Sequence, residues 1–180
     1  MNRALGGRTT IADGPGGPEV HIRAPRQWWA LVFLPVWFVG WTFGGIMAIR
    51  QMVIEPQLFL AVWLVGWLAG EVFVTLAWSW MAFGEEVISV AQGTLAVARR
   101  VGPWQFARRY PLHECRALRA AGWFGSPMSF ADSLRPSGLT GGTVAIDRDS
   151  KPIRFGIGLD EAEANAVVKE LEPYVGAAQR

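Results

Sequence analysis

Residues 33–44 read FLPVWFVGWTFG and residues 59–70 read FLAVWLVGWLAG, so the chain carries one apolar pattern twice. The copies align without a gap as F-L-x-V-W-x-V-G-W-x-x-G. On a helix of 3.6 residues per turn, positions i, i+3, i+4 and i+7 share one face. These positions hold Trp and Gly in both copies: Trp37, Gly40, Trp41 and Gly44, then Trp63, Gly66, Trp67 and Gly70. Because small residues four apart let helices approach closely, we expect two similar helices packed through these Trp/Gly faces.

Each copy lies in a segment long enough to cross a membrane. Residues 28–49 contain no charged side chain, and residues 57–83 contain only Glu71. A helix that rises about 1.5 Å per residue over such a length spans a hydrocarbon core of roughly 30 Å. The connection at residues 50–56 is short, so the helices should be antiparallel neighbours. The sequence therefore predicts a two-helix transmembrane hairpin over residues 27–84.

Composition and charge favour a membrane protein and indicate its orientation. Hydrophobic residues make up 51% of the chain, which is rich in tryptophan with ten Trp, and mean hydropathy is +0.22. Arginines flank the outer ends of the two segments, whereas the connection carries only Arg50 beside Glu55. The positive-inside rule then predicts a multi-pass protein of the inner (cytoplasmic) membrane with both termini in the cytoplasm. A formal net charge of +2 gives no reason to expect nucleic acid as a partner.

The rest of the chain is expected to form an arm and one small domain. Residues 1–26 contain GPGGP at 14–18, which predicts an extended N-terminal arm without regular structure. After the hairpin, alternating apolar residues predict antiparallel strands at residues 87–91, 94–101, 104–110, 112–120, 143–148 and 153–157. Asp160, with Glu163 three residues later, predicts the cap of a final amphipathic helix. Its apolar stripe comprises Ala164, Val167, Val168, Leu171, Tyr174 and Val175. Residues 85–180 are thus expected to be an α+β domain.

This order of elements resembles a pleckstrin-homology-like (PH-like) domain. Residues 28–172 resemble small bacterial inner-membrane proteins that join a two-helix transmembrane hairpin to a cytoplasmic PH-like domain. The duplicated VGW-x-x-G segments carry the resemblance, together with GEEVISV at 84–90 and RFGIGLDEAEA at 154–164. The resemblance implies a fold and a location, and no particular activity. It also implies an acidic residue after both VGW-x-x-G copies, whereas this chain has Glu71 after the second and Gly45 after the first.

Glu71 is the strongest single candidate for a functional residue. It lies near the middle of the second span, where an ionised carboxylate costs at least about 2 kcal/mol. Its spacing from Trp63 and Trp67 directs it to the partner helix, so we expect it to pair with the indole N–H of Trp37 or with a donor on another subunit. Two interpretations stay open: a structural hydrogen bond between helices, or a proton or partner-recognition site.

Two further groups are candidates for binding surfaces. Six arginines are expected close to the membrane on adjacent strands: Arg99, Arg100, Arg108, Arg109, Arg116 and Arg119. Such a band attracts anionic lipid head groups or an acidic protein partner, and it can also be a solvated strand face. The long loop at residues 121–142 carries four apolar side chains that are expected to form an interface: Trp123, Phe124, Met128 and Phe130.

The residue pattern predicts no catalytic, cofactor or metal site. Cys115 is the only cysteine, and His113, Cys115 and His21 have no third group that would complete a reactive set. The leading hypothesis is therefore a non-catalytic accessory or scaffold subunit. It would pack against other integral membrane subunits of a larger inner-membrane complex, respiratory or photosynthetic, and a homo-oligomer is possible in principle. The alternatives are a sensor or organiser of the anionic lipid surface, and a small oligomeric transporter or enzyme that uses Glu71.

Overall fold

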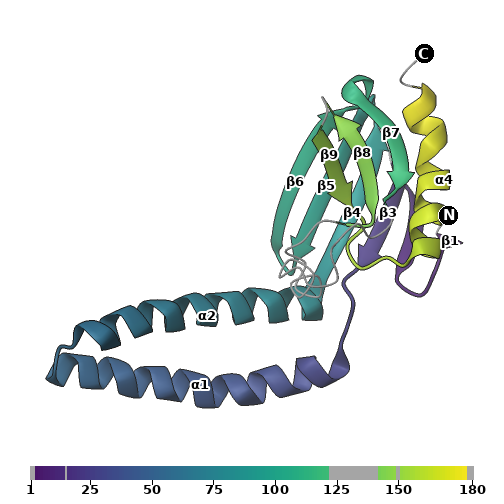
Figure 1. Ribbon diagram of the computed structural model, residues 1–180. Helices are drawn as coiled ribbons and strands as arrows, with labels where there is room; N and C mark the ends of the chain where they lie inside the picture. Colours follow the sequence, from purple (N-terminus) through teal and green to yellow (C-terminus); the bar gives the residue numbers. More distant parts are fainter. Residues whose placement is uncertain (1–2, 15, 122–141, 149–150, 178–180) are drawn as a thin grey trace.

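The chain combines two long helices with a β domain. The structure is a computed structural model that describes residues 3–14, 16–121, 142–148 and 151–177. The helices are α1 (Trp28–Ile54), α2 (Leu58–Phe83) and the C-terminal α4 (Glu161–Ala177). The strands are β1 (Arg3–Ala4), β2 (Thr9–Gly14), β3 (Gly17–Arg23), β4 (Gly84–Ala91), β5 (Thr94–Val101), β6 (Trp104–Pro111), β7 (Cys115–Ala120), β8 (Val144–Arg148) and β9 (Lys151–Phe155). Figure 1 shows α1 and α2 projecting side by side from the β domain.

Within the described residues, the strands form two antiparallel sheets. One sheet has the order β1-β2-β3-β4-β5-β6, and the other has the order β7-β8-β9. The strands expected after residue 85 are all present, which confirms that part of the prediction. One detail differs, because Leu112–Glu114 is a 3-10 turn, η1, where the chain passes from the first sheet to the second.

The helical hairpin is inserted between two paired strands. β3 and β4 are neighbours in the first sheet, with Arg23 opposite Glu85, although both long helices lie between them in the sequence. The backbone N–H of Ala24 donates to the carbonyl oxygen of Gly84 at 3.0 Å, which extends this pairing to the base of the helices. One sheet therefore holds both open ends of the hairpin (Figure 1).

Residues 3–4, 9–14 and 17–23 form strands of this sheet, in place of the expected arm. Their side chains alternate between the core and the surface, with Ile11, Val20 and Ile22 buried. Pro18 is tolerated because it precedes Glu19, where the pairing of β3 with β4 begins. Gly17 has a φ of +149°, and a Cβ there would overlap the carbonyl oxygen of Val90. The Gly/Pro-rich stretch thus ends one strand and begins the next.

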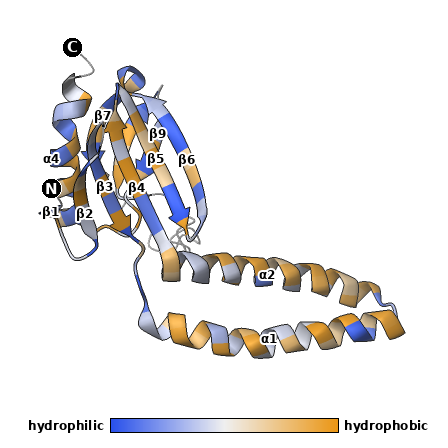
Figure 2. Ribbon diagram, turned by 180° about the vertical axis from the view of Figure 1, so that it is seen from behind, coloured by the Kyte–Doolittle hydropathy of each residue, from blue (hydrophilic) through white to orange (hydrophobic). Residues whose placement is uncertain are grey.

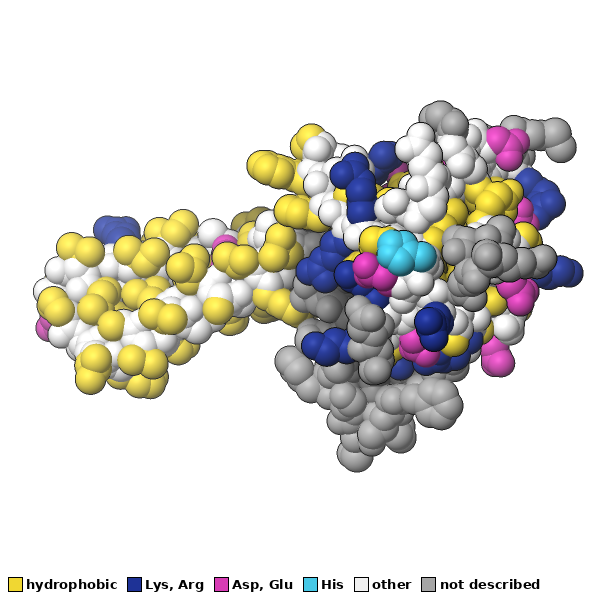
Figure 3. Space-filling model, turned by 90° about the horizontal axis from the view of Figure 1, so that it is seen from above, with side chains coloured by type: hydrophobic (Ala, Val, Ile, Leu, Met, Phe, Trp, Pro, Cys, Tyr) yellow, Lys and Arg dark blue, Asp and Glu magenta, His cyan; other side chains and the backbone are white. Residues whose placement is uncertain are grey.

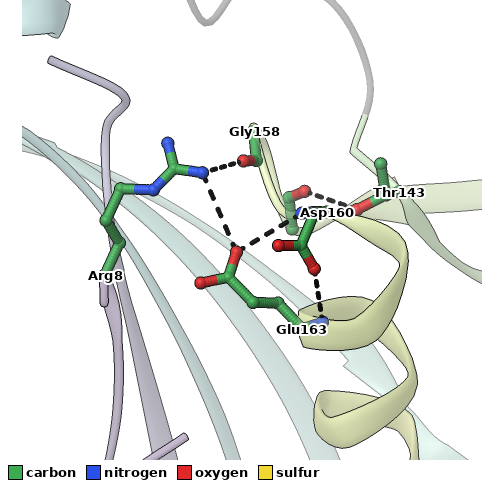
Figure 4. Close-up of polar contacts among 6 residues, drawn as sticks. Arg8, Thr143, Gly158, Asp160 and Glu163 are labelled. Atoms are coloured by element: carbon green, nitrogen blue, oxygen red, sulfur yellow. Dashed lines mark hydrogen bonds and ion pairs between the residues drawn. The ribbon is translucent and has the colours of Figure 1, made fainter. Parts of the chain in front are cut away.

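The C-terminal helix closes the core and ties down the N-terminal strands. The N–H of Glu163 donates to Asp160 Oδ1 at 2.7 Å, and the N–H of Asp160 donates to Glu163 Oε2 at 3.3 Å, which confirms the predicted cap (Figure 4). Arg8, just before β2, donates to the carbonyl oxygen of Gly158 at 2.5 Å and lies 3.8 Å from Glu163 Oε2. The predicted stripe is buried at Ala164, Val167, Leu171 and Val175, with Val168 packed against the core. Tyr174 is 43% exposed and lies outside the stripe.

The two long helices bury almost none of their apolar surface within this chain. α1 continues to Ile54, beyond the predicted end, and only Glu55 to Gln57 connect it to α2. By length and composition both helices can cross a membrane, and their most apolar stretches are only 6% and 0% buried. A core helix of a soluble protein would be mostly buried. Figure 2 shows apolar residues along the whole hairpin and on several strands of the β domain.

Candidate functional site

The contact between α1 and α2 is a seam of residues spaced three or four apart. The seam comprises Leu31, Leu34, Phe38, Trp41, Gly45 and Ala48 on α1, and Ala61, Leu64, Trp67, Gly70, Val74 and Ala77 on α2. Two indoles bond across it to backbone of the other helix. Trp67 Nε1 donates to the carbonyl oxygen of Trp41 at 3.3 Å, and Trp78 Nε1 donates to that of Leu31 at 3.2 Å. These two bonds and the close packing of the seam hold the two helices together.

The close approach in this seam occurs at Gly45. A Cβ on Gly45 would overlap the indole ring of Trp67, and one on Gly70 would touch Trp41 at 3.8 Å. By contrast, no atom lies within 4 Å of the Cβ positions of Gly40, Gly44 and Gly66. Those three glycines, which we expected in the helix contact, face away from it.

The tryptophans of the repeated pattern are divided in the same way. Trp41 and Trp67 are half-buried in the seam, whereas Trp37 and Trp63 are 38% and 40% exposed. Trp37 stacks on Trp41, with ring centroids 4.9 Å apart and 25° between planes. Equivalent tryptophans therefore have the same place in both copies, and the copies differ at their last glycine, since Gly70 lies in the seam and Gly44 does not.

Glu71 lies next to Gly70 at the side of the seam and accepts a hydrogen bond from the opposite helix. Thr42 Oγ1 donates to Glu71 Oε1 at 2.6 Å, so the partner is this threonine and not the Trp37 indole. The other carboxylate oxygen is buried and has no hydrogen-bond partner among the residues that the structure describes. A buried oxygen without a hydrogen bond costs free energy, so a donor group that reached this oxygen would bind there favourably.

Glu86 is a buried carboxylate at the junction of hairpin and domain, and the sequence analysis missed it. Its side chain is 1% exposed. Oε2 accepts the backbone N–H groups of Gly156 at 2.7 Å and Ile157 at 2.9 Å, while Oε1 lies 3.5 Å from Arg99 Nε. The alternation of GEEVISV could have revealed it, because Glu86, Ile88 and Val90 share one face of a strand. Glu86 thus fixes the β9–α4 loop beside the helix ends.

The six arginines do not form one band. Arg99 and Arg100 lie on β5, and Arg108 and Arg109 lie on the neighbouring β6. Alternation along each strand puts one arginine of each pair on either face of the sheet.

Arg116 and Arg119 belong to the second sheet, on β7. Arg119 binds Asp147 with two bonds, Nη1 to Oδ2 at 2.5 Å and Nη2 to Oδ1 at 3.0 Å. The hydrogen bond from Arg119 lowers the pKa of the Asp147 carboxyl, and that carboxylate raises the pKa of Arg119. This arginine is therefore occupied by an ion pair within the domain.

The predicted interface loop and the question of a metal site remain to be compared with the described residues. The interface loop residues Trp123, Phe124, Met128 and Phe130 lie outside the described residues. In the described ranges, no group of three or more His, Cys, Asp or Glu side chains could hold a metal ion. No protein-family model matches this sequence, and searches of curated proteins and of solved structures give no match either.

Proposed function

We propose that this protein is a non-catalytic accessory subunit of the inner (cytoplasmic) membrane. Its hairpin would pack against the helices of a larger complex, respiratory or photosynthetic, and its PH-like domain would contact the cytoplasmic face of that complex. In this proposal both termini are cytoplasmic, because the arginine-rich β domain lies at the open end of the hairpin and the tip carries only Arg50 beside Glu55.

The observation that carries the proposal is the small-residue face of α1 that the hairpin leaves unused. Gly40 and Gly44 are one turn apart, both are exposed, and nothing in the described chain fills the space beside them. Phe33 and Trp37 lie on the same side of the helix by its periodicity, in the turns that precede the two glycines. Helices in membranes associate through small residues that let two backbones approach closely. A further transmembrane helix fits this face.

The test adds bulk to this face without disturbing the hairpin itself. A Cβ at Gly40 or Gly44 meets no other part of the described chain within 4 Å, so we expect the fold to tolerate Gly40→Ile combined with Gly44→Ile. Val32→Phe combined with Val39→Phe is the matched control, since it adds similar bulk on a different, exposed face of α1. Each variant is extracted from its native membrane in mild detergent, and the mass of the intact assembly is measured.

We expect the wild type and the control to co-purify with other membrane polypeptides. The Gly40/Gly44 variant should separate at the mass of one chain, 19.8 kDa plus detergent. A wild type that is itself a stable single chain would contradict the proposal. A wild-type assembly made only of copies of this chain would also contradict the proposal and would show that the protein is a homo-oligomer.

A further inference from the structure

A groove of about 680 Å³ lies where the two sheets meet at their edges. β6 is the edge strand of the first sheet, and β9 is the edge strand of the second. Three arginines from three strands line the groove: Arg99 of β5, Arg108 of β6 and Arg154 of β9. Phe106 and Tyr110 form part of its apolar wall. Basic groups thus converge here from both sheets, although they are far apart in the sequence.

The positive charge of this groove is only partly balanced. Arg99 lies 3.5 Å from Glu86 Oε1, which reaches it from the buried side. Arg108 and Arg154 make no hydrogen bond or ion pair with any residue in the described ranges, and both are exposed. Guanidinium groups bind phosphate oxygens through paired N–H donors, so two unneutralised arginines beside a third suit a phosphate group.

The groove lies on the side of the domain toward which the long helices project. Figure 1 places β6 on that side, and Figure 3 shows Lys and Arg side chains gathered where the domain meets the helices. At the end of β5, Val101 packs against the buried cluster of Ala24, Trp80 and Ile157, which brings the β5–β6 turn close to the end of α2. Just after this turn, Trp104 and Phe106 are 69% and 71% exposed. Exposed aromatic residues beside a transmembrane segment are typical of the membrane interface.

We infer that this groove binds the phosphate of an anionic phospholipid in the membrane that the hairpin enters. Arg99, Arg108 and Arg154 contact the phosphate, and Phe106 lies against the apolar part of the lipid below the head group. The inference rests on the insertion of the hairpin proposed above, and not on the docking of another subunit.

The test compares two double substitutions that remove the same charge from the full-length protein. Arg108→Gln with Arg154→Gln empties the groove of its unpaired arginines. Arg109→Gln with Arg116→Gln is the control, because neither residue lines the groove: Arg109 follows Arg108 on the opposite face of β6, and Arg116 lies on β7. Each protein is purified in micelles doped equally with phosphatidylglycerol and phosphatidylcholine, and mass spectrometry of the intact protein counts the retained lipids.

The wild type and the control should retain phosphatidylglycerol in preference to phosphatidylcholine. The Arg108/Arg154 variant should lose roughly 25-fold in that preference, since each of the two basic residues near a lipid surface contributes roughly a fivefold effect. Equal losses in both variants, or no preference in the wild type, would overturn the inference. Release of the lipid by millimolar inorganic phosphate would also overturn it, because the groove would then take a soluble phosphate compound.

Extraction of membranes with alkaline carbonate separates this inference from its premise. If the wild type stays in the membrane but shows no lipid preference, the groove assignment fails and the insertion stands. If carbonate releases the wild type, the insertion itself fails.

Discussion

Replacing Gly45 by alanine should weaken the hairpin, whereas the same change at the adjacent Gly44 should not. A methyl group on Gly45 occupies the position of the Trp67 ring, so the indole must turn or the helices must separate. Overpacking of this kind costs about 1–3 kcal/mol. Turning the indole also breaks its bond to the Trp41 carbonyl, which is worth about 0.6 kcal/mol between membrane helices. We expect a total loss of about 2–4 kcal/mol in the free energy of unfolding.

The assay is unfolding of the full-length protein in mixed micelles with increasing dodecyl sulfate, followed by circular dichroism and tryptophan emission. Gly44→Ala has open space around its new methyl group, so its unfolding midpoint should match that of the wild type. In a Trp67→Ala background, the cost of Gly45→Ala should disappear, because the ring that it meets is gone. Equal stability of the two single variants would refute the helix contact described above.

Three further predictions concern the β domain. Glu86→Ala leaves the N–H groups of Gly156 and Ile157 unpaired and should lower the free energy of unfolding by about 3–5 kcal/mol. Glu86→Gln keeps an acceptor oxygen and should lower it less, as measured by thermal unfolding. Equal losses in the two variants would contradict these hydrogen bonds. Asp160→Ala should destabilise the domain by about 1 kcal/mol in the same measurement, whereas Asp160→Asn should remain close to the wild type. Because the pKa of Asp147 is lowered by Arg119, this pair stabilises the fold above the ordinary carboxyl value of 3.8, and its contribution is lost as the pH falls through the lower folded value. The difference in thermal midpoint between wild type and Asp147→Asn should therefore shrink on acidification, and a difference that grows would oppose the assignment.

The elements with a strong period were predictable from the sequence. The six strands after residue 85 and the C-terminal helix occur where periodicity placed them, because each buries one regular face, and the two long helices occur where long uncharged segments placed them. The N-terminal strands were missed for a physical reason. The run GPGGP at residues 14–18 predicted a chain without regular structure. The alternation of Val20 and Ile22 is too short to predict a strand by itself, and it is the pairing with β4 that makes this segment a strand.

The contacts of the candidate site were less predictable than the elements that carry them. The repeated Trp/Gly pattern could not show that Gly45, outside the pattern, would meet Trp67, since this depends on the offset between the helices. Likewise, Thr42 became the partner of Glu71 through the rotation of α1, which a single helix does not reveal. The separation of the arginines onto two sheets depends on η1, where the chain changes sheet.

If the hairpin enters a membrane as proposed, its place between β3 and β4 makes the assembly of the first sheet depend on both helices crossing the bilayer. The ribosome synthesises β1, β2 and β3 before either long helix, so β3 cannot pair with β4 until both helices have been made. If only one helix crossed, the two halves of the sheet would lie on opposite sides of the membrane and could never pair. In that arrangement, the pairing of β3 with β4 requires that both helices have crossed.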